Sequence, residues 1–183
     1  MNPSEDTRNL IDKFKGMSNE AIVAELDKTR IPLEVAIENL AHDFNIGTVV
    51  RNANAFNVSR VHIIGKRKYN RRGAMVTDKY LHIDHFATVD EFVNDAHYRG
   101  YKVVAVDNNR PEAKPLAKTK LSPNSVLVFG SESDGISQEL LDKSDQAFYI
   151  EQLGSTRSIN VGCASAVAMY EAVRQLGLLP KDA

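Results

Sequence analysis

The order of apolar runs along the chain predicts an α/β fold built on a largely parallel sheet. Short β-branched segments at residues 60–65, 101–106 and 124–130 have the length and composition of buried strands. Segments with helical spacing lie between them, among them residues 91–100. Strands that alternate with helices are typical of a parallel sheet covered by helices. With 183 residues and 43% hydrophobic content, the chain is long enough for one domain with a sizeable core.

The elements follow in order from a mostly polar N-terminal segment, which we expect to span residues 1–32 and to contain one short helix. Ser18 is a candidate N-cap for that helix. The main domain then covers residues 33–183. Its expected elements are a strand at 33–40, a helix from Ile46, a strand at 60–65, a helix at 91–100, strands at 101–106 and 124–130, a helix at 137–144, a strand at 146–150 and a helix at 160–177.

Charge is distributed unevenly, although the net charge is only -1. Residues 44–77 contain no Asp or Glu and carry seven cations, five of which lie within residues 66–72. These five are Lys66, Arg67, Lys68, Arg71 and Arg72. A lone basic run is usually a solvated loop. This run directly follows a strand, at the sheet edge where parallel sheets bind ligands, and the position favours a phosphate-bearing partner.

The helix that begins near Ile46 carries an unusual arginine. Its apolar stripe runs to Phe56 and leaves Arg51 on another face, between the small residues Gly47 and Ala55. A guanidinium fork there suits phosphate or carboxylate, while an ordinary surface ion pair is the alternative. Asn45 is most simply the N-cap of this helix.

Two further polar segments follow strands. In the first, Gly130 and Glu132 come just after a buried strand, where Glu132 could orient a cation or hydroxyl or simply be solvated. In the second, residues 154–160 form a polar run between a strand and an Ala-rich helix. Asn160 could cap that helix, but capping does not explain the whole run.

Together, and in this order, the three segments resemble the SpoU (TrmH-like) family of RNA ribose 2′-O-methyltransferases in the SPOUT superfamily. The family motifs match Asn45, Gly47, Arg51, Ala55 and Phe56; then Gly130, Glu132 and Gly135; then Gly154, Ser158, Ile159, Asn160 and Val161. The resemblance covers residues 33 to about 177. It departs from the family at Asn57, Ser131 and Ser133, and at Glu151 and Gln152, which replace the usual Pro and Met.

The resemblance implies a SPOUT-type sheet with helices on both faces and a C-terminal trefoil knot, which periodicity alone would not predict. It implies a metal-free homodimer that binds S-adenosylmethionine through Gly130, Ile150, Gly154 and Ile159. Arg51 would face the methyl donor, S-adenosylmethionine, bound to its own or to the partner subunit. The residues that would orient Arg51 and the ribose are Asn45, Glu132, Ser158 and Asn160. Because a guanidinium resists deprotonation, either Arg51 or an RNA phosphate could accept the hydroxyl proton.

Other interpretations of the sequence remain open. The chain could be an RNA-binding protein of this fold without methyltransferase activity, or an enzyme that methylates bases, and neither the RNA nor its nucleotide is identified.

With no signal peptide or membrane span and a single cysteine, Cys163, we expect a cytoplasmic protein. His82 and His85 lack the companions of a zinc site, and the GxGxxG pattern of nicotinamide enzymes is missing.

Overall fold

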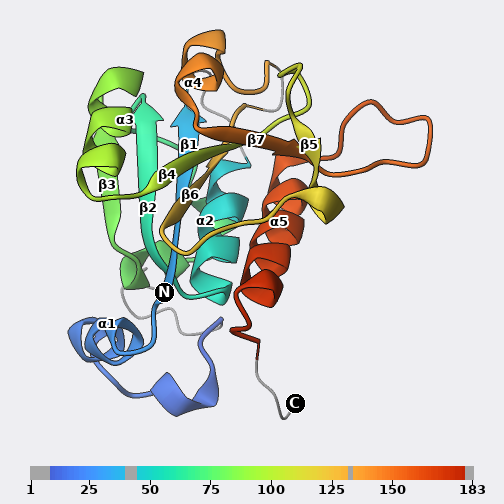
Figure 1. The fold of residues 1–183 in the computed structure, drawn as a ribbon. Coiled ribbons are helices and arrows are strands. Elements are labelled where there is room, and N and C mark those ends of the chain that lie inside the picture. The colour runs from blue at the N-terminus through green and yellow to red at the C-terminus, as the bar shows by residue number, and fades with distance from the viewer. Residues whose placement is uncertain (1–8, 40–44, 132–133, 180–183) are drawn as a thin grey trace.

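The computed structural model describes residues 9–39, 45–131 and 134–179, which fold around one parallel sheet (Figure 1). Seven strands form this sheet within the described ranges, in the order β3-β2-β1-β6-β4-β7-β5. Their bounds are β1 Ile31–Asn39, β2 Val58–Gly65, β3 Ile83–Phe86, β4 Lys102–Val106, β5 Lys114–Pro115, β6 Ser125–Phe129 and β7 Gln146–Tyr149. Every strand pair is parallel, which confirms the predicted fold class.

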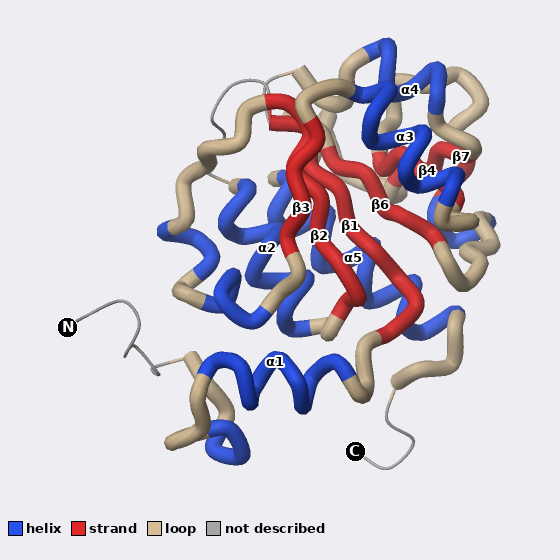
Figure 2. Tube along the Cα trace, turned by 90° about the vertical axis from the view of Figure 1, so that its left-hand side faces the viewer, coloured by secondary structure: helices blue, strands red, loops and turns tan. Residues whose placement is uncertain are grey.

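The helices cover both faces of the sheet, as predicted. Their bounds are α1 Asn19–Asp27, α2 Ile46–Ala55, α3 Val89–Tyr98, α4 Gln138–Lys143 and α5 Val161–Gln175. The buried side chains of α2 and α5 belong to one core cluster, and those of α3 and α4 belong to another. In Figure 2, α1 lies beyond the end of the sheet opposite to α4. Ser18 is its N-cap, because the hydroxyl accepts a hydrogen bond from Ala21 N.

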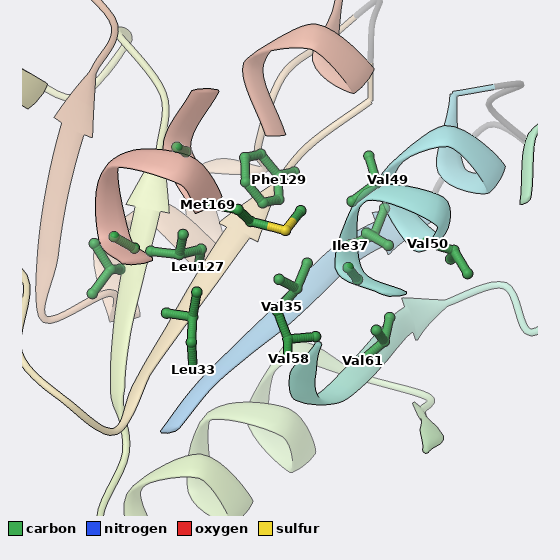
Figure 3. Close-up of a cluster of buried hydrophobic side chains, with 14 of the residues drawn as sticks. Leu33, Val35, Ile37, Val49, Val50, Val58, Val61, Leu127, Phe129 and Met169 are labelled. Atoms are coloured by element: carbon green, nitrogen blue, oxygen red, sulfur yellow. The ribbon is translucent and has the colours of Figure 1, made fainter. Parts of the chain in front are cut away.

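The apolar stripe predicted for α2 forms the centre of the larger core. Val49 and Val50 are fully buried and pack with Val35 of β1 and Met169 of α5 (Figure 3). Burying each of these side chains contributes about 1.5–3 kcal/mol. The core therefore fixes α2 and α5 side by side on one face of the sheet.

The opposite face contains a buried ionic cluster. Glu34 of β1 accepts hydrogen bonds from Arg99 Nη1 at 2.7 Å on Oε1 and from Arg99 Nη2 at 2.9 Å on Oε2, and His62 Nε2 lies 2.7 Å from Oε2. Burial alone raises the pKa of the Glu34 carboxyl, but the hydrogen bonds from His62 and Arg99 outweigh it and hold the pKa below its ordinary value. The cluster interrupts the apolar pattern expected of a strand covered on both faces.

The structure contains two strands that the sequence pattern did not predict. β3 has only four residues, three of them polar or aromatic, and β5 has two residues at the sheet edge, one of them a proline. Both lack the long β-branched run that marks a buried strand. The predicted boundary after residue 32 lies within β1, and Leu40 lies outside the described residues. The trefoil knot stays a prediction.

None of the helices in the described ranges is long and apolar enough to span a bilayer.

Candidate active site

A pocket opens where three neighbouring strands end. β4, β6 and β7 reach it with their C-terminal residues, and the first turn of α5 closes one side. This is the edge at which open parallel sheets bind ligands. The lining residues are Val106, Asp107, Asn108, Asn109, Phe129, Gly130, Ser131, Asp134, Gly135, Tyr149, Ile150, Gln152, Arg157, Ser158, Ile159, Val161 and Ala164.

The loop after β6 folds back tightly on itself beside the pocket. Ser131 and Gly135 exchange two backbone hydrogen bonds of 3.0 Å. A Cβ added at Gly130 would lie 2.0 Å from the carbonyl carbon of Gly135, which itself has a φ of +71°. Only glycine allows this approach and this backbone conformation. Glu132, a predicted catalytic residue, lies outside the described residues.

Asp107, which was not predicted as a site residue, holds this loop from the end of β4. Its Oδ1 accepts a hydrogen bond from Asn109 N at 2.7 Å, and its Oδ2 accepts one from Ile136 N at 3.0 Å. In the sequence, the run from Asp107 to Asn109 marks only the end of a strand. Its position after a buried strand, at the ligand-binding edge, was the signal that could have identified it.

The loop after β7 contributes most of the predicted donor-binding residues. Ile150 and Ile159 line the pocket, as does Ser158, whereas Gly154 does not. Gly154 is exposed, and Figure 1 shows that this loop extends away from the sheet before it returns to α5. Two lining residues were not predicted as ligands. Arg157 is exposed, and Gln152 has a buried Oε1 with no hydrogen-bond partner among the described residues, so it offers an acceptor to a ligand.

Asn160 joins the third motif to the first. Its Oδ1 accepts hydrogen bonds from Gly162 N at 2.9 Å and Cys163 N at 3.3 Å, which confirms the predicted cap on α5. Its Nδ2 donates to Asn45 Oδ1 at 2.9 Å. Asn45 occupies the N-cap position of α2, as predicted, but its side chain makes no capping hydrogen bond to that helix. The side chain of Asn45 instead accepts the hydrogen bond from Asn160 Nδ2.

Close packing explains the glycine at position 47 of α2, whereas Ala55, on the other side of Arg51, is exposed. Gly47 is buried, and a Cβ there would lie 2.8 Å from both Asn70 O and Ala74 N. Gly47 therefore opens no space beside Arg51, because the segment after β2 packs directly against it. On the same helix, Thr48 lies against Gly162, where a Cβ would come within 2.7 Å of Thr48 Cγ2.

Arg51 is exposed, as predicted, but it does not line the pocket. Its Nη2 donates to Asn9 Oδ1 at 3.3 Å. The next residue, Asn52, donates to Gly162 O at 2.8 Å and to Ser165 Oγ at 2.9 Å, which locks α2 onto α5. Within one chain, Arg51 thus lies on a helix that packs against α5, and its side chain does not line the pocket.

The predicted basic residues divide into two groups. Lys66, Arg67, Lys68 and Arg72 are exposed and make no ion pair with the part of the chain that the structure describes. Arg71 is different, because it forms an ion pair with Asp78, whose side chain is only 5% exposed. Tyr69 packs partly against the core; burial, followed by the charge of Asp78, raises the pKa of its hydroxyl to about 12.

No group of three or more His, Cys, Asp or Glu residues with the arrangement of a metal site occurs in the described ranges. His82 Nε2 lies 2.9 Å from Asp27 Oδ1, and His85 Nε2 lies 2.6 Å from Gly65 O. Each imidazole therefore already has a partner within the fold.

Comparison with known proteins agrees with this geometry. Residues 32–170 match the SpoU rRNA Methylase family. The tRNA (guanosine(18)-2′-O)-methyltransferase of Escherichia coli K12 is 29% identical over 161 residues, which cover 85% of this chain and 69% of that protein. The crystal structure of the A. aeolicus TrmH/SpoU tRNA modifying enzyme superposes with a TM-score of 0.75 at 25% identity, over 87% of this chain and 82% of that one.

A third relative has a ligand. The structure of the SpoU methyltransferase AviRb from Streptomyces viridochromogenes, in complex with the cofactor AdoMet, superposes with a TM-score of 0.72. The match covers 81% of this chain and 59% of that one. At 21% identity, this likeness shows the shared fold.

Proposed function

This chain belongs to the SpoU rRNA methylase family, and on that premise we propose that it is an RNA methyltransferase. It transfers the methyl group of S-adenosylmethionine to a ribose 2′-hydroxyl of tRNA or rRNA, in the cytoplasm. One observation carries the proposal. The hydrogen bond between Asn160 and Asn45 joins the first motif to the third beside a pocket that the second and third motifs line. The names of the relatives support the reaction and the class of substrate.

The pocket residues fit the methyl donor. Phe129, Ile159 and Val161 provide apolar surface for an adenine ring, and the glycine backbone of the loop after β6 permits close approach of a ligand. The orphaned acceptor of Gln152 can receive a hydrogen bond from an exocyclic amine. When bound, S-adenosylmethionine supplies an electrophilic methyl group on a sulfonium. We propose that the main chain at Gly130, Ile150 and Ile159 holds it.

The remaining site residues then position the acceptor. A ribose oxygen must lie in line with the methyl carbon and lose its proton as the new bond forms. We propose that Ser158 and Asn160 orient the ribose from the pocket side, together with Asn45 and Glu132. Arg51 binds the adjacent RNA phosphate through its guanidinium fork. The proton passes either to that phosphate or to Arg51.

A homodimer would bring Arg51 to the donor. Arg51 lies outside the pocket of its own chain, so we propose that it faces the pocket of the partner subunit. The outer face of α5 supports such an interface, because Val167 and Tyr170 are 43% and 50% exposed there. They line an apolar groove with Leu116 and with Phe56 at the end of α2. Burying this groove against a second copy would remove apolar surface from water and place α2 at the interface.

The exposed cations at residues 66–72 are the proposed RNA-binding surface, since they follow β2 at the same edge of the sheet as the pocket. Apart from Arg71, they make no ion pair with other described residues, so their charges remain available to phosphates.

Transfer of labelled methyl from S-adenosylmethionine to tRNA and rRNA tests the proposal. We expect incorporation at a ribose, which nucleoside analysis of the digested RNA distinguishes from a base. Binding of RNA without incorporation would instead support an RNA-binding protein of this fold. Mapping the nucleotides that lose 2′-O-methylation in a strain lacking the gene identifies the substrate.

A further inference from the structure

We propose that Glu38 and Asn39, the last two residues of β1, are positioning residues that each present one substrate-binding loop. Glu38 holds the loop that lines the donor pocket, and Asn39 holds the basic segment at residues 66–72. This pairing rests on the proposed function, because it assigns one residue to each of the two substrates.

The two side chains lie on opposite faces of β1, because successive residues of a strand alternate. Both are almost completely buried, at 3% exposure for Glu38 and 1% for Asn39. β1 is an interior strand of the sheet, with β2 on one side and β6 on the other. Its end therefore lies between the loop that follows β2 and the loop that follows β6.

Glu38 fixes the far end of the donor loop. Its Oε2 accepts a hydrogen bond from Ser137 N at 2.7 Å. The preceding amide, Ile136 N, donates to Asp107 Oδ2 at 3.0 Å. Two carboxylates, one at the end of β1 and one directly after β4, thus hold consecutive amides, and the pocket-lining Gly135 directly precedes them.

Asn39 fixes the basic segment through its backbone. Its Nδ2 donates to Lys66 O at 2.5 Å and to Lys68 O at 3.0 Å. With these two carbonyl groups held by a buried amide, the side chains of Lys66 and Lys68 remain exposed to solvent. The cations are in this way pre-organised for phosphates, which reduces the ordering cost of binding.

Fold stability alone does not favour these residue types. Glu34, on the same strand, has its buried charge compensated by Arg99. Glu38 makes no ion pair with any described residue, and Asn39 Oδ1 is buried without a hydrogen-bond partner in the described ranges. Uncompensated buried polar groups cost free energy that an apolar side chain would not. The groups that these residues do bind are the backbones of the two loops.

Separate measurement of the two affinities tests the pairing. Glu38→Ala should raise the Kd for S-adenosylmethionine about tenfold and leave the Kd for RNA nearly unchanged. Asn39→Ala should do the reverse. Glu38→Gln keeps an acceptor for Ser137 N and should restore donor affinity. Glu34→Ala is the matched control, since this buried carboxylate of the same strand touches neither loop; it should lower stability and change neither Kd.

A second pair of variants changes the other partner of this hydrogen bond, the amide of Ser137, and leaves the buried Glu38 in place. Ser137 has a φ of -60°, which proline accepts, so Ser137→Pro deletes the amide hydrogen that Glu38 receives. Ser137→Ala keeps this hydrogen and loses only the helix cap. We expect Ser137→Pro to bind S-adenosylmethionine more weakly than Ser137→Ala does.

Equal losses of both affinities in Glu38→Ala or Asn39→Ala, or no difference between the two Ser137 variants, would overturn the pairing. Failure of the proposed function has a different signature, because the unmodified protein would then bind no S-adenosylmethionine.

Discussion

Asn160 Nδ2 donates a hydrogen bond to Asn45 Oδ1 at 2.9 Å and thereby connects two residues 115 positions apart in the chain. The same Asn160 caps α5, so one side chain fixes the start of that helix and its distance from the start of α2. Motif residues that only share an order in the sequence become neighbours through this hydrogen bond.

Substitution of Asn160 separates its two roles. Asn160→Asp keeps the oxygen that accepts hydrogen bonds from Gly162 N and Cys163 N. It loses the Nδ2 amide that donates a hydrogen bond to Asn45 Oδ1. We expect a Tm close to that of the unmodified protein and a decrease in kcat/KM of about 100-fold, the cost of misplacing a reacting group by about 1 Å. Asn160→Ala should show a similar decrease in activity and should also lose about 1 kcal/mol of stability, since it removes the cap. Equal activity of Asn160→Asp and the unmodified protein would contradict the role of the hydrogen bond to Asn45.

Arg51 should be needed for methyl transfer and not for donor binding. Arg51→Ala is expected to lower kcat by about 10²- to 10³-fold or more, because it removes a preorganised charge at the reacting centre. Calorimetric titration with S-adenosylmethionine should give a Kd within a few-fold of the unmodified value. Near-normal turnover of this variant would refute the role of Arg51.

Mixed dimers test whether Arg51 acts on the partner's pocket. Gly130→Val should destroy the pocket, because a Cβ at that position overlaps the backbone of Gly135. Each of Arg51→Ala and Gly130→Val should be inactive alone. After subunit exchange, a mixed dimer contains one intact pocket facing one intact Arg51, and activity should return. If the mixture remains inactive while mass spectrometry detects mixed dimers, Arg51 acts within its own chain.

The basic segment should control the salt dependence of RNA binding. Replacing Lys66, Arg67, Lys68 and Arg72 by Ala should weaken the dependence of RNA binding on salt. The slope of log Kd against log salt concentration should decrease by roughly 0.7–0.9 for each phosphate that is no longer neutralised. Arg71→Ala should change this slope least. It should instead lower the free energy of unfolding by about 1–3 kcal/mol, because Asp78 is left buried without its partner. An unchanged slope in the fourfold variant would place the RNA elsewhere.

Acid should destabilise the fold through Glu34. Its pKa is lower in the folded protein than in the unfolded chain, so its contribution is fully present above the unfolded pKa, near about 4.3. The contribution is lost as the pH falls through the lower, folded pKa. Glu34→Gln should therefore be less stable at neutral pH and should lose less stability between about pH 5 and 3. Urea unfolding of both proteins at several pH values measures the difference, and parallel curves would contradict this assignment.

The alternation of strands and helices, the apolar stripe of α2 and the residues of the three motifs can all be recognised in the amino-acid sequence. These features are local, because strand length, helical spacing and capping depend on neighbours within a few positions. Which residues come into contact depends on how distant segments pack, and this became visible only in the fold. The strand order places the ends of β4, β6 and β7 together, which brought Asp107 and Arg157 to the pocket and kept Arg51 off its wall. Gly47 packs against the segment after β2. Helical periodicity shows which face of α2 is apolar, but it does not show which distant segment packs against a given residue.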